Sequence, residues 1–358
     1  MRLPTAPARV AAATIAIVAL VTAALAAREP SPGEGRIGYS THLAYAGSPD
    51  EDLARLSDAG VDWIREDFLW NTIERSRGRF DWRATDALMA AAAEHELDVL
   101  AILGYSARWA SRGAIQDPPR DPADYAAFAR AVVERYGEGG SFWRGRDIVR
   151  PLKAVELWNE PWGHFFWRPE PDPAAYARLA RPAAEAVRAA HAGVEVLVSA
   201  DLLQVRADGA ERPWFAALLD ADPRLPELVD GWSVHPYTEP RDRGPGAGPP
   251  SSPYAFARVE QIRALARRRG AMRPIWLTEV GWSTSSGPGG VSEARQAAYL
   301  GAALDRALGP WRSFVARVFV YGYDRDNGAR DDLEGHFGVR RANGSLKPAW
   351  DAVARRAG

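Results

Sequence analysis

Two glutamates in this sequence each close a short apolar run and have tryptophan nearby. Glu160 lies in the segment WNEP at 158–161, and Glu279 lies in the segment WLTEVGW at 276–282. Two carboxyl groups presented in this way predict glycoside hydrolysis, because that reaction uses one carboxyl group to protonate the leaving oxygen and a second to attack the sugar or to activate water. The prediction requires a fold that brings Glu160 and Glu279 to one site.

The size and charge of the chain restrict its fold and its partners. Its 358 residues suit a single eight-stranded α/β barrel with insertions. The formal net charge is −1, so no overall field attracts nucleic acid or an acidic membrane, and we expect a neutral partner. The sequence has no cysteine, which excludes disulfides, thiolate catalysis and zinc–thiolate sites.

The first 27 residues have the layout of a secretory signal peptide. Arg2 and Arg9 precede an apolar stretch at 10–27 that ends in small residues. The alternative is an uncleaved anchor, since an apolar run of this length is at the lower limit for spanning a bilayer. Residues 28–35 are expected to form a short tether, or the new N-terminus if the signal is cleaved. We expect the folded part to be secreted or held at the extracytoplasmic face of the membrane, with 10–27 as its possible membrane tether.

From residue 36 onwards, short apolar runs rich in β-formers alternate with longer amphipathic segments rich in alanine. This alternation is typical of a parallel sheet built from βα units. The eight candidate strands are 37–42, 63–70, 99–105, 154–160, 194–200, 229–237, 274–281 and 318–323. Asp-Pro pairs at 121–122 and 172–173 predict helix starts, because Asp is a good N-cap and Pro suits the first turn. The sequence predicts one domain over 36–358, a (β/α)8 barrel.

Polar and aromatic residues gather at the ends of these predicted strands, where the loops of a barrel build the active face. They are Arg65, Trp70, Tyr105, Asn159, Glu160, His235, Tyr237, Glu279, Trp282, Tyr321 and Tyr323. The fourth and seventh strands lie opposite each other across the mouth of a barrel. We therefore expect Glu160 and Glu279 to face one another over a gap the size of a sugar.

Taken together, the motifs resemble those of clan A glycoside hydrolases, especially family 39 and the cellulase-like proteins of family 5. The resemblance rests on WNEP at 158–161, WSVHPY at 232–237, TEVGW at 278–282, GRFDW at 78–82, HFG at 336–338 and LKPA at 346–349. It covers nearly all of the chain after the N-terminal segment. It implies a retaining hydrolase of an extracellular, β-linked poly- or oligosaccharide, with Glu160 as acid/base and Glu279 as nucleophile.

The two glutamates should differ in protonation. Carboxyl groups in retaining enzymes stand ~5–5.5 Å apart, so two negative charges disfavour each other and one group keeps its proton. Glu160, flanked by tryptophan, is the better candidate for the protonated group. We expect Arg65 and the hydroxyl of Tyr237 to hold Glu279 ionised.

The other predicted site residues would bind the sugar. The resemblance implies that Asn159 donates to the sugar 2-hydroxyl, a contact that strengthens in the transition state. We expect His235 to hydrogen-bond sugar hydroxyls or to tune the two glutamates. The predicted aromatic contacts to substrate are Trp70, Tyr105, Trp282 and Tyr323.

Simpler structural explanations exist for several of these residues. Asn159 and Glu160 suit the start of a helix, and Arg65 could pair at the surface with its neighbours in sequence, Glu66 or Asp67. A single tryptophan is more often a core residue than a ligand platform. This alternative applies to Trp70, Trp109, Trp162, Trp167 and Trp282.

Other chemistries have little support in the sequence. It has no His-Glu-x-x-His segment, no glycine-rich loop continuing into Lys-Ser/Thr and no Gly-x-Ser-x-Gly segment, so we expect neither a metal nor a cofactor. The chain departs from clan A after the eighth strand, where the common tryptophan is replaced by YGYD at 321–324. This leaves the sugar open, and it leaves a catalytically silent barrel that binds polysaccharide as the alternative to an enzyme.

Overall fold

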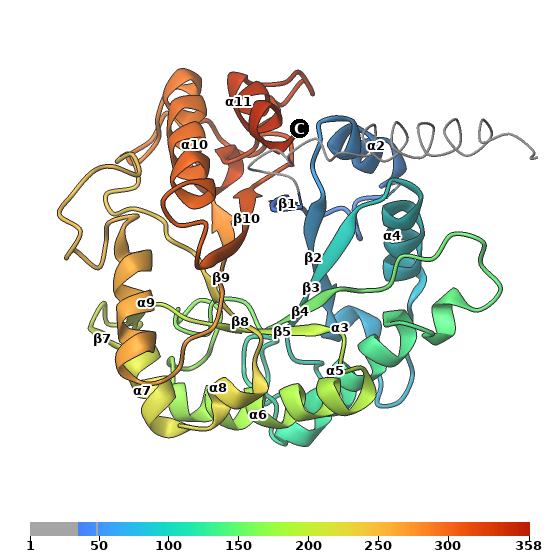
Figure 1. Ribbon diagram of the computed structural model, residues 1–358. Helices are drawn as coiled ribbons and strands as arrows, with labels where there is room; N and C mark the ends of the chain where they lie inside the picture. The colour runs from blue at the N-terminus through green and yellow to red at the C-terminus, as the bar shows by residue number, and fades with distance from the viewer. Residues whose placement is uncertain (1–34, 48) are drawn as a thin grey trace, which may run out of the picture.

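The computed structural model describes residues 35–47 and 49–358 (Figure 1). The predicted signal or anchor segment at 1–27, and all but the last residue of the predicted tether at 28–35, lie outside the described residues. No helix in the described part is long and apolar enough to cross a bilayer.

Eight parallel strands close into a barrel, as the sequence predicts, in the order β1-β10-β9-β8-β5-β4-β3-β2. They are β1 (Ile37–Ser40), β2 (Trp63–Leu69), β3 (Asp98–Gly104), β4 (Ala154–Leu157), β5 (Glu195–Ser199), β8 (Gly231–Val234), β9 (Ile275–Val280) and β10 (Val315–Tyr321). Each overlaps a candidate strand, with bounds that differ by up to three residues. β4 ends three residues early because Trp158 and Glu160 adopt left-handed backbone conformations, with φ of 70° and 44°.

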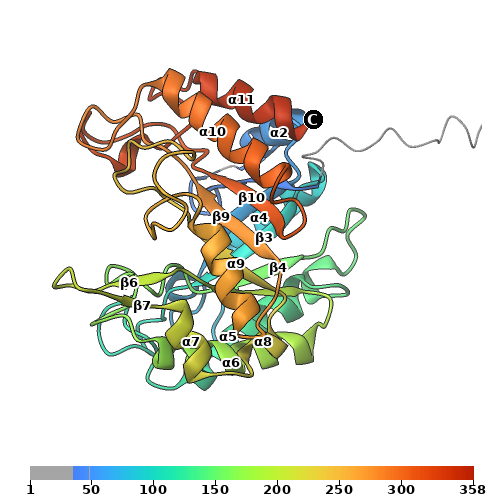
Figure 2. The same cartoon turned by 60° about the vertical axis from the view of Figure 1, so that its left-hand side comes forward.

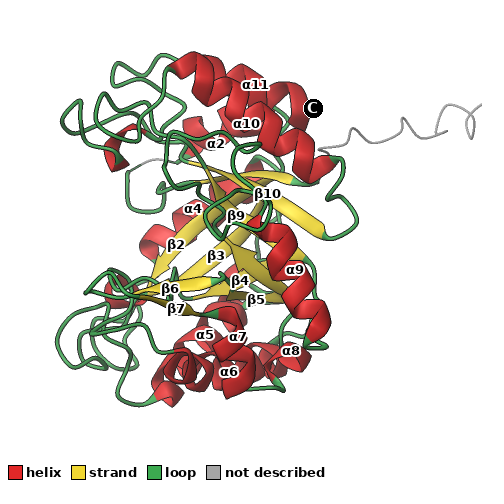
Figure 3. Cartoon of the chain, turned by 90° about the vertical axis from the view of Figure 1, so that its left-hand side faces the viewer, coloured by secondary structure: helices red, strands yellow, loops and turns green. Residues whose placement is uncertain are grey.

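Helices surround the barrel on its outside (Figures 1 and 3). The longer ones are α2 (Asp50–Asp58), α4 (Arg83–Glu94), α5 (Pro122–Tyr136), α6 (Pro173–Ala190), α9 (Arg258–Arg268), α10 (Glu293–Leu308) and α11 (Pro348–Ala357). The short ones are α3 (Trp70–Ile73), α7 (Phe215–Ala221), α8 (Leu225–Leu228), and the 3₁₀ turns η1 (Ser141–Trp143) and η2 (Glu334–His336). Both predicted Asp-Pro starts are confirmed, since Asp121 and Asp172 accept backbone N–H bonds at the first turns of α5 and α6.

A two-stranded antiparallel hairpin lies outside the barrel and was not predicted. It consists of β6 (Leu203–Val205) and β7 (Glu211–Pro213). Figure 2 shows it projecting beside the long loops at one end of the barrel. Its strand β6 pairs with the loop after β4, because the Val205 N–H donates to the Trp162 carbonyl at 2.9 Å and the Val205 carbonyl accepts from the His164 N–H at 3.1 Å.

The inside of the barrel has an apolar layer under a charged one. Its apolar layer is Trp63, Leu100, Ala154, Leu197, Trp276 and Phe319. Side chains in a strand alternate between its two faces, so the residues two positions further along β2, β4 and β9 also face inward. These are Arg65, Glu156 and Thr278, all buried. The apolar layer therefore excludes water below a polar layer at the mouth of the barrel, where the predicted site lies.

Candidate active site

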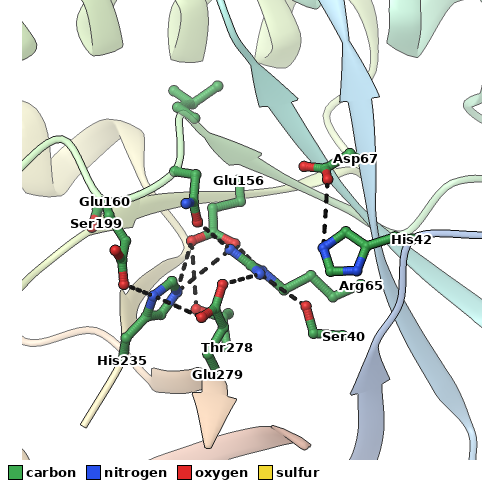
Figure 4. Close-up of polar contacts among 12 residues, drawn as sticks. Ser40, His42, Arg65, Asp67, Glu156, Glu160, Ser199, His235, Thr278 and Glu279 are labelled. Carbon is green, nitrogen blue, oxygen red and sulfur yellow. Dashed lines mark hydrogen bonds and ion pairs between the residues drawn. The ribbon is translucent and has the colours of Figure 1, made fainter. Parts of the chain in front are cut away.

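Glu160 and Glu279 meet at one end of the barrel, as predicted. An oxygen of Glu160, an oxygen of Glu279 and a ring nitrogen of His235 all lie within 4.8 Å of one another. Both glutamates line a cavity of about 730 Å³, yet the exposed fractions of the two residues are only 9% and 8%. Figure 4 shows their carboxyl groups on either side of the His235 ring.

The carboxylate of Glu279 is held by donors on both oxygens. The Arg65 Nη1 donates to Oε1 at 2.7 Å, and the Tyr237 hydroxyl donates to Oε2 at 2.8 Å. Burial by itself raises the pKa of Glu279, but the positive charges of His235 and Arg65 together with these hydrogen bonds outweigh burial and lower the pKa below 4.5. The donors are the two that the sequence predicts, and they keep Glu279 ionised.

Arg65 organises the charged layer of the barrel. Its side chain is 1% exposed, and its Nε donates to Glu156 Oε2 at 2.7 Å while Nη2 donates to Asn159 Oδ1 at 2.8 Å. The alternative explanation, that Arg65 forms a surface ion pair with Glu66 or Asp67, is therefore wrong. The sequence analysis did not identify Glu156, although its place two residues after Ala154, which faces the inside of the barrel, gives it the same inward parity.

Replacing Arg65 with methionine is expected to destabilise the protein by about 3–5 kcal/mol, because a fully buried Glu156 carboxylate would lose its cation. Chemical denaturation measures the loss. The double variant Arg65→Met/Glu156→Gln should regain part of it, because it removes the unpaired charge. A single variant within about 1 kcal/mol of wild type, the range of ordinary substitutions, would contradict this account.

Glu160 is paired with His235. The His235 Nδ1 lies 2.6 Å from Glu160 Oε1 and 3.5 Å from Glu279 Oε2. Burial lowers the pKa of His235, but the charge of Glu279 and the hydrogen bond to Glu160 outweigh burial and raise it above 6.5. Trp158 is buried, and its indole N–H donates to the Phe166 carbonyl. The Glu160 carboxyl group is therefore hydrogen-bonded to an imidazole, whereas the prediction from the sequence relied on its flanking tryptophans.

Asn159 lies between Arg65 and the cavity. Because its Oδ1 accepts from Arg65, its amide nitrogen faces the cavity side, where it donates to the Tyr105 hydroxyl at 3.2 Å. The helix-start alternative for Asn159 and Glu160 is excluded, since the next helix, α6, begins at Pro173.

Three of the predicted aromatic contacts do not reach the cavity. Trp70, Trp282 and Tyr323 are buried among the barrel and its helices, and none lines the cavity. Each has its polar atom satisfied inside the protein, by Glu74, the Arg243 carbonyl and Asp52 respectively. These three predictions are corrected by the structure. Trp167 is also a core residue, and Trp109 packs on Trp70.

The remaining predicted residues gather at the site. Arg65, Tyr105, Asn159, Tyr237 and both glutamates line the cavity, and His235 lies buried against the two glutamates. Among the five tryptophans in doubt, Trp162 lines the cavity. Tyr321, and not Tyr323, is the residue from the end of β10 that faces it.

Loops supply most of the cavity residues that the sequence analysis missed. The loop after β4 and the β6–β7 hairpin contribute an aromatic and apolar wall, and other loops together with Asp67 of β2 and Glu334 of η2 contribute a charged rim. The wall contains His164, Phe165, Phe166 and Val205, and the rim contains His42, Asp67, Glu239, Arg241 and Glu334. Phe165 is 72% exposed.

His42 is a cationic group of this rim, in addition to Arg241. Its Nδ1 lies 2.7 Å from Asp324 Oδ2. Burial lowers the pKa of His42, but the hydrogen bond and charge of Asp324, with Asp67, outweigh burial and raise it to about 9. The cavity therefore offers both charged hydrogen-bonding groups and aromatic faces.

Glu160, His235 and Glu279 are close enough to be considered as metal ligands. Their hydrogen bonds argue for another use. Both oxygens of Glu279 already accept from Arg65 and Tyr237, and the guanidinium group of Arg65 would repel a cation at this point. The donor set is suited to moving a proton and stabilising a carboxylate.

No family model matches this chain, and no curated protein matches it. Solved structures do. A family 39 glycoside hydrolase from the gut symbiont Bacteroides cellulosilyticus matches with a TM-score of 0.67 at 21% identity, over 92% of this chain and 65% of that one. The GH39 enzyme from Xanthomonas axonopodis pv. citri matches with a TM-score of 0.62 at 21% identity, over 89% and 64%.

A variant of a GH5_18 protein from Bifidobacterium longum, solved in complex with Manb1-4GlcNAc, matches with a TM-score of 0.61 at 17% identity, over 90% of this chain and 77% of that one. This chain spans slightly less than two thirds of the length of the two family 39 proteins. At these identities the likeness concerns the fold, and it confirms at that level the expected resemblance to families 39 and 5.

Proposed function

We propose that this chain is a retaining glycoside hydrolase that cleaves β-linked carbohydrate by double displacement, with Glu279 as nucleophile and Glu160 as acid/base. The separation of the two carboxyl groups carries the proposal. One oxygen of Glu160 lies within 4.8 Å of one oxygen of Glu279, which is nearer to the ~5–5.5 Å spacing of the carboxyl groups in retaining enzymes than to the ~6.5–9.5 Å with which inverting enzymes admit water.

In the first step, a Glu279 oxygen attacks the anomeric carbon while Glu160 gives its proton to the leaving oxygen. Arg65 and Tyr237 keep Glu279 ionised for this attack and orient its two oxygens. In the second step, Glu160 takes a proton from water as the water oxygen attacks the anomeric carbon, and the bond from that carbon to the Glu279 oxygen breaks, which releases the sugar and restores both carboxyl groups. His235 lies 2.6 Å from Glu160 Oε1, so it can stabilise the carboxylate that Glu160 becomes between the steps.

Carbohydrate is the substrate class that the cavity supports best. Its wall offers aromatic faces and its rim offers charged groups, and sugars present both apolar C–H faces and hydroxyl groups. The fold is shared with glycoside hydrolases, one of them bound to Manb1-4GlcNAc. The nearly neutral net charge of the chain agrees with an uncharged polymer.

We also propose that the enzyme works outside the cytoplasm, on the signal-like pattern at 1–27. N-terminal sequencing of the native protein distinguishes a cleaved signal from a retained anchor. Recovery of uncleaved chain from the cytoplasm alone would contradict this location.

Covalent trapping tests the proposed reaction. A panel of 2-deoxy-2-fluoro β-glycosides with reactive leaving groups should yield a protein of increased mass, with the sugar mapped to Glu279 by peptide sequencing. The fluorine slows both steps, because it destabilises their oxocarbenium-like transition states, while the reactive leaving group speeds only the first, so the covalent intermediate accumulates. Glu279→Gln is the control and should remain unlabelled. A label on another residue, with hydrolysis intact, would contradict the assignment. Binding of polysaccharide without hydrolysis or label would instead favour the silent barrel.

A further inference from the structure

One three-residue segment, His235 to Tyr237, controls the surroundings of both glutamates. His235 Nδ1 lies 2.6 Å from Glu160 Oε1, and the Tyr237 hydroxyl lies 2.8 Å from Glu279 Oε2. Figure 4 shows His235 between the two carboxyl groups. A shift of this segment would therefore change the contacts of both glutamates at once.

The segment lies beyond the ladder of the barrel. The pairing of β8 with β9 ends at Val234, and its pairing with β5 ends at Ser233. The Tyr237 N–H donates to the His235 carbonyl at 2.9 Å, which closes a tight turn around Pro236. This bond pairs the His235 carbonyl, which can accept a second donor, and leaves the Tyr237 carbonyl in need of one, since buried backbone groups are costly when unpaired.

Arg258 supplies those donors. Its Nη2 donates to the His235 carbonyl at 2.7 Å, and its Nη1 donates to the Tyr237 carbonyl. Arg258 is the first residue of α9 and is only 6% exposed. Its counter-ion is the buried Asp201, in the loop after β5, with Oδ2 at 3.2 Å from Nη2. The planar fork of a guanidinium group suits two neighbouring acceptors, which a lysine cannot match.

We infer that Arg258, held by Asp201, is a positioning residue that sets the places of His235 and Tyr237 against the two glutamates. It does not line the cavity, so it acts through the turn and not on substrate. The inference rests on the proposed function for its kinetic consequences, although the contacts themselves do not depend on the reaction.

Kinetics on any substrate that the wild type hydrolyses give the first test. Arg258→Met is expected to lower kcat about 100-fold, the usual effect of misplacing catalytic groups by about 1 Å, with KM changed much less. Arg258→Lys keeps the charge beside Asp201 but loses the two-pronged geometry of the guanidinium group, so its kcat should lie between those of the wild type and Arg258→Met. Arg267→Met, on the exposed part of the same helix, is the matched control and should behave as wild type.

The pH profile separates positioning from a loss of folded protein, because unfolding lowers activity at all pH values without moving the limbs. The groups that face His235 are Glu160, Glu279, Glu156 and Arg65. Loss of Arg258 displaces His235 relative to these charged groups, which changes the pKa values of the site. One limb of the pH–activity profile should therefore shift in Arg258→Met and stay in place in Arg267→Met. Added guanidinium should restore activity to Arg258→Ala by refilling the vacated space.

Nitrogen NMR of the histidine side chains gives a test that needs no activity. The His235 resonances, assigned by their loss in His235→Gln, should move in Arg258→Met and Arg258→Lys and stay in place in Arg267→Met. Unmoved resonances with wild-type kcat in both Arg258 variants would overturn the inference. If the wild type hydrolyses nothing but the resonances move as expected, the positioning role stands and the proposed reaction fails.

Discussion

Replacing Glu279 with alanine is expected to lower kcat/KM by about 10⁴-fold or more on every substrate that the wild type cleaves, as expected for removal of a nucleophile. The loss should fall on kcat, since the side chain acts on the anomeric carbon. Steady-state kinetics over a panel of β-glycosides and polysaccharides measure it. Glu94→Ala, an exposed carboxylate at the end of α4, is the control and should keep full activity.

A small anion should partly replace the missing carboxylate. Azide added to Glu279→Ala occupies the space of the side chain and should attack the sugar from the same face, giving a glycosyl azide inverted with respect to the substrate. This product identifies Glu279 by its stereochemistry. Activity in Glu279→Ala above about one hundredth of wild type, far more than loss of a nucleophile allows, would sink the assignment.

The acid side of the pH profile follows from the same residue. Because Arg65, His235 and Tyr237 lower the pKa of Glu279 below 4.5, the nucleophile stays ionised until the pH falls through that lowered value. The acid limb of wild-type kcat/KM should therefore lie below pH 4.5.

The alternation of strands explains why much of this site could be predicted. Asn159 and Glu279 follow from counting eight strands and taking the residues near the ends of two of them, because barrel closure brings those ends together. Arg65, predicted towards the end of the second strand, is the third of the seven residues of β2 and reaches the site through its inward parity with Trp63. The same rule applied more fully would have found Asp67, which has the inward parity of Arg65 on β2. It would also have found His42, at the end of the first predicted strand.

The same alternation explains the failures. One residue of offset at a strand end turns a side chain to the opposite face. Trp70 already belongs to α3, and its ring stacks on Phe128 of α5 outside the barrel. Tyr321 is the last residue of β10 and faces the cavity, whereas Tyr323 lies two residues beyond the strand, where the alternation no longer applies, and packs against Trp350. Composition at a strand end indicates which residues are near the site, but only the backbone path decides which face it.

The loops set a second limit. Phe165 and Arg241 reach the cavity from loops after β4 and β8, whose paths depend on contacts with distant segments. The loop after β4 is held by the hairpin strand β6, which pairs with it at Val205. Such pairings carry no periodic signal. Arg258 was hidden for a similar reason, because at the start of an arginine-rich helix it looks like a solvent-facing charge.

Replacing Glu160 with alanine is expected to produce a loss that depends on the leaving group. For natural substrates, whose leaving oxygen needs a proton, kcat/KM should fall by about 10²–10⁴-fold, the usual contribution of general acid–base catalysis. For a dinitrophenyl glycoside, which leaves without a proton, kcat/KM should fall far less. The second step should then limit turnover, because no base activates the water, and a burst of phenol should precede a slow steady state.

The neighbours of Glu160 predict the rest of its behaviour. The His235 pKa is raised above 6.5, so the imidazole keeps its proton until the pH rises through that value. Its Nδ1 can pass this proton to Glu160 Oε1 at 2.6 Å, so the basic limb of wild-type kcat/KM should lie above pH 6.5. In Glu160→Ala this limb should vanish for the dinitrophenyl substrate, which needs no acid. Azide should speed its second step and give a product of retained configuration, opposite to that from Glu279→Ala. An equal loss for all leaving groups would instead make Glu160 a support for His235, since a proton donor must discriminate between leaving groups that need a proton and those that do not.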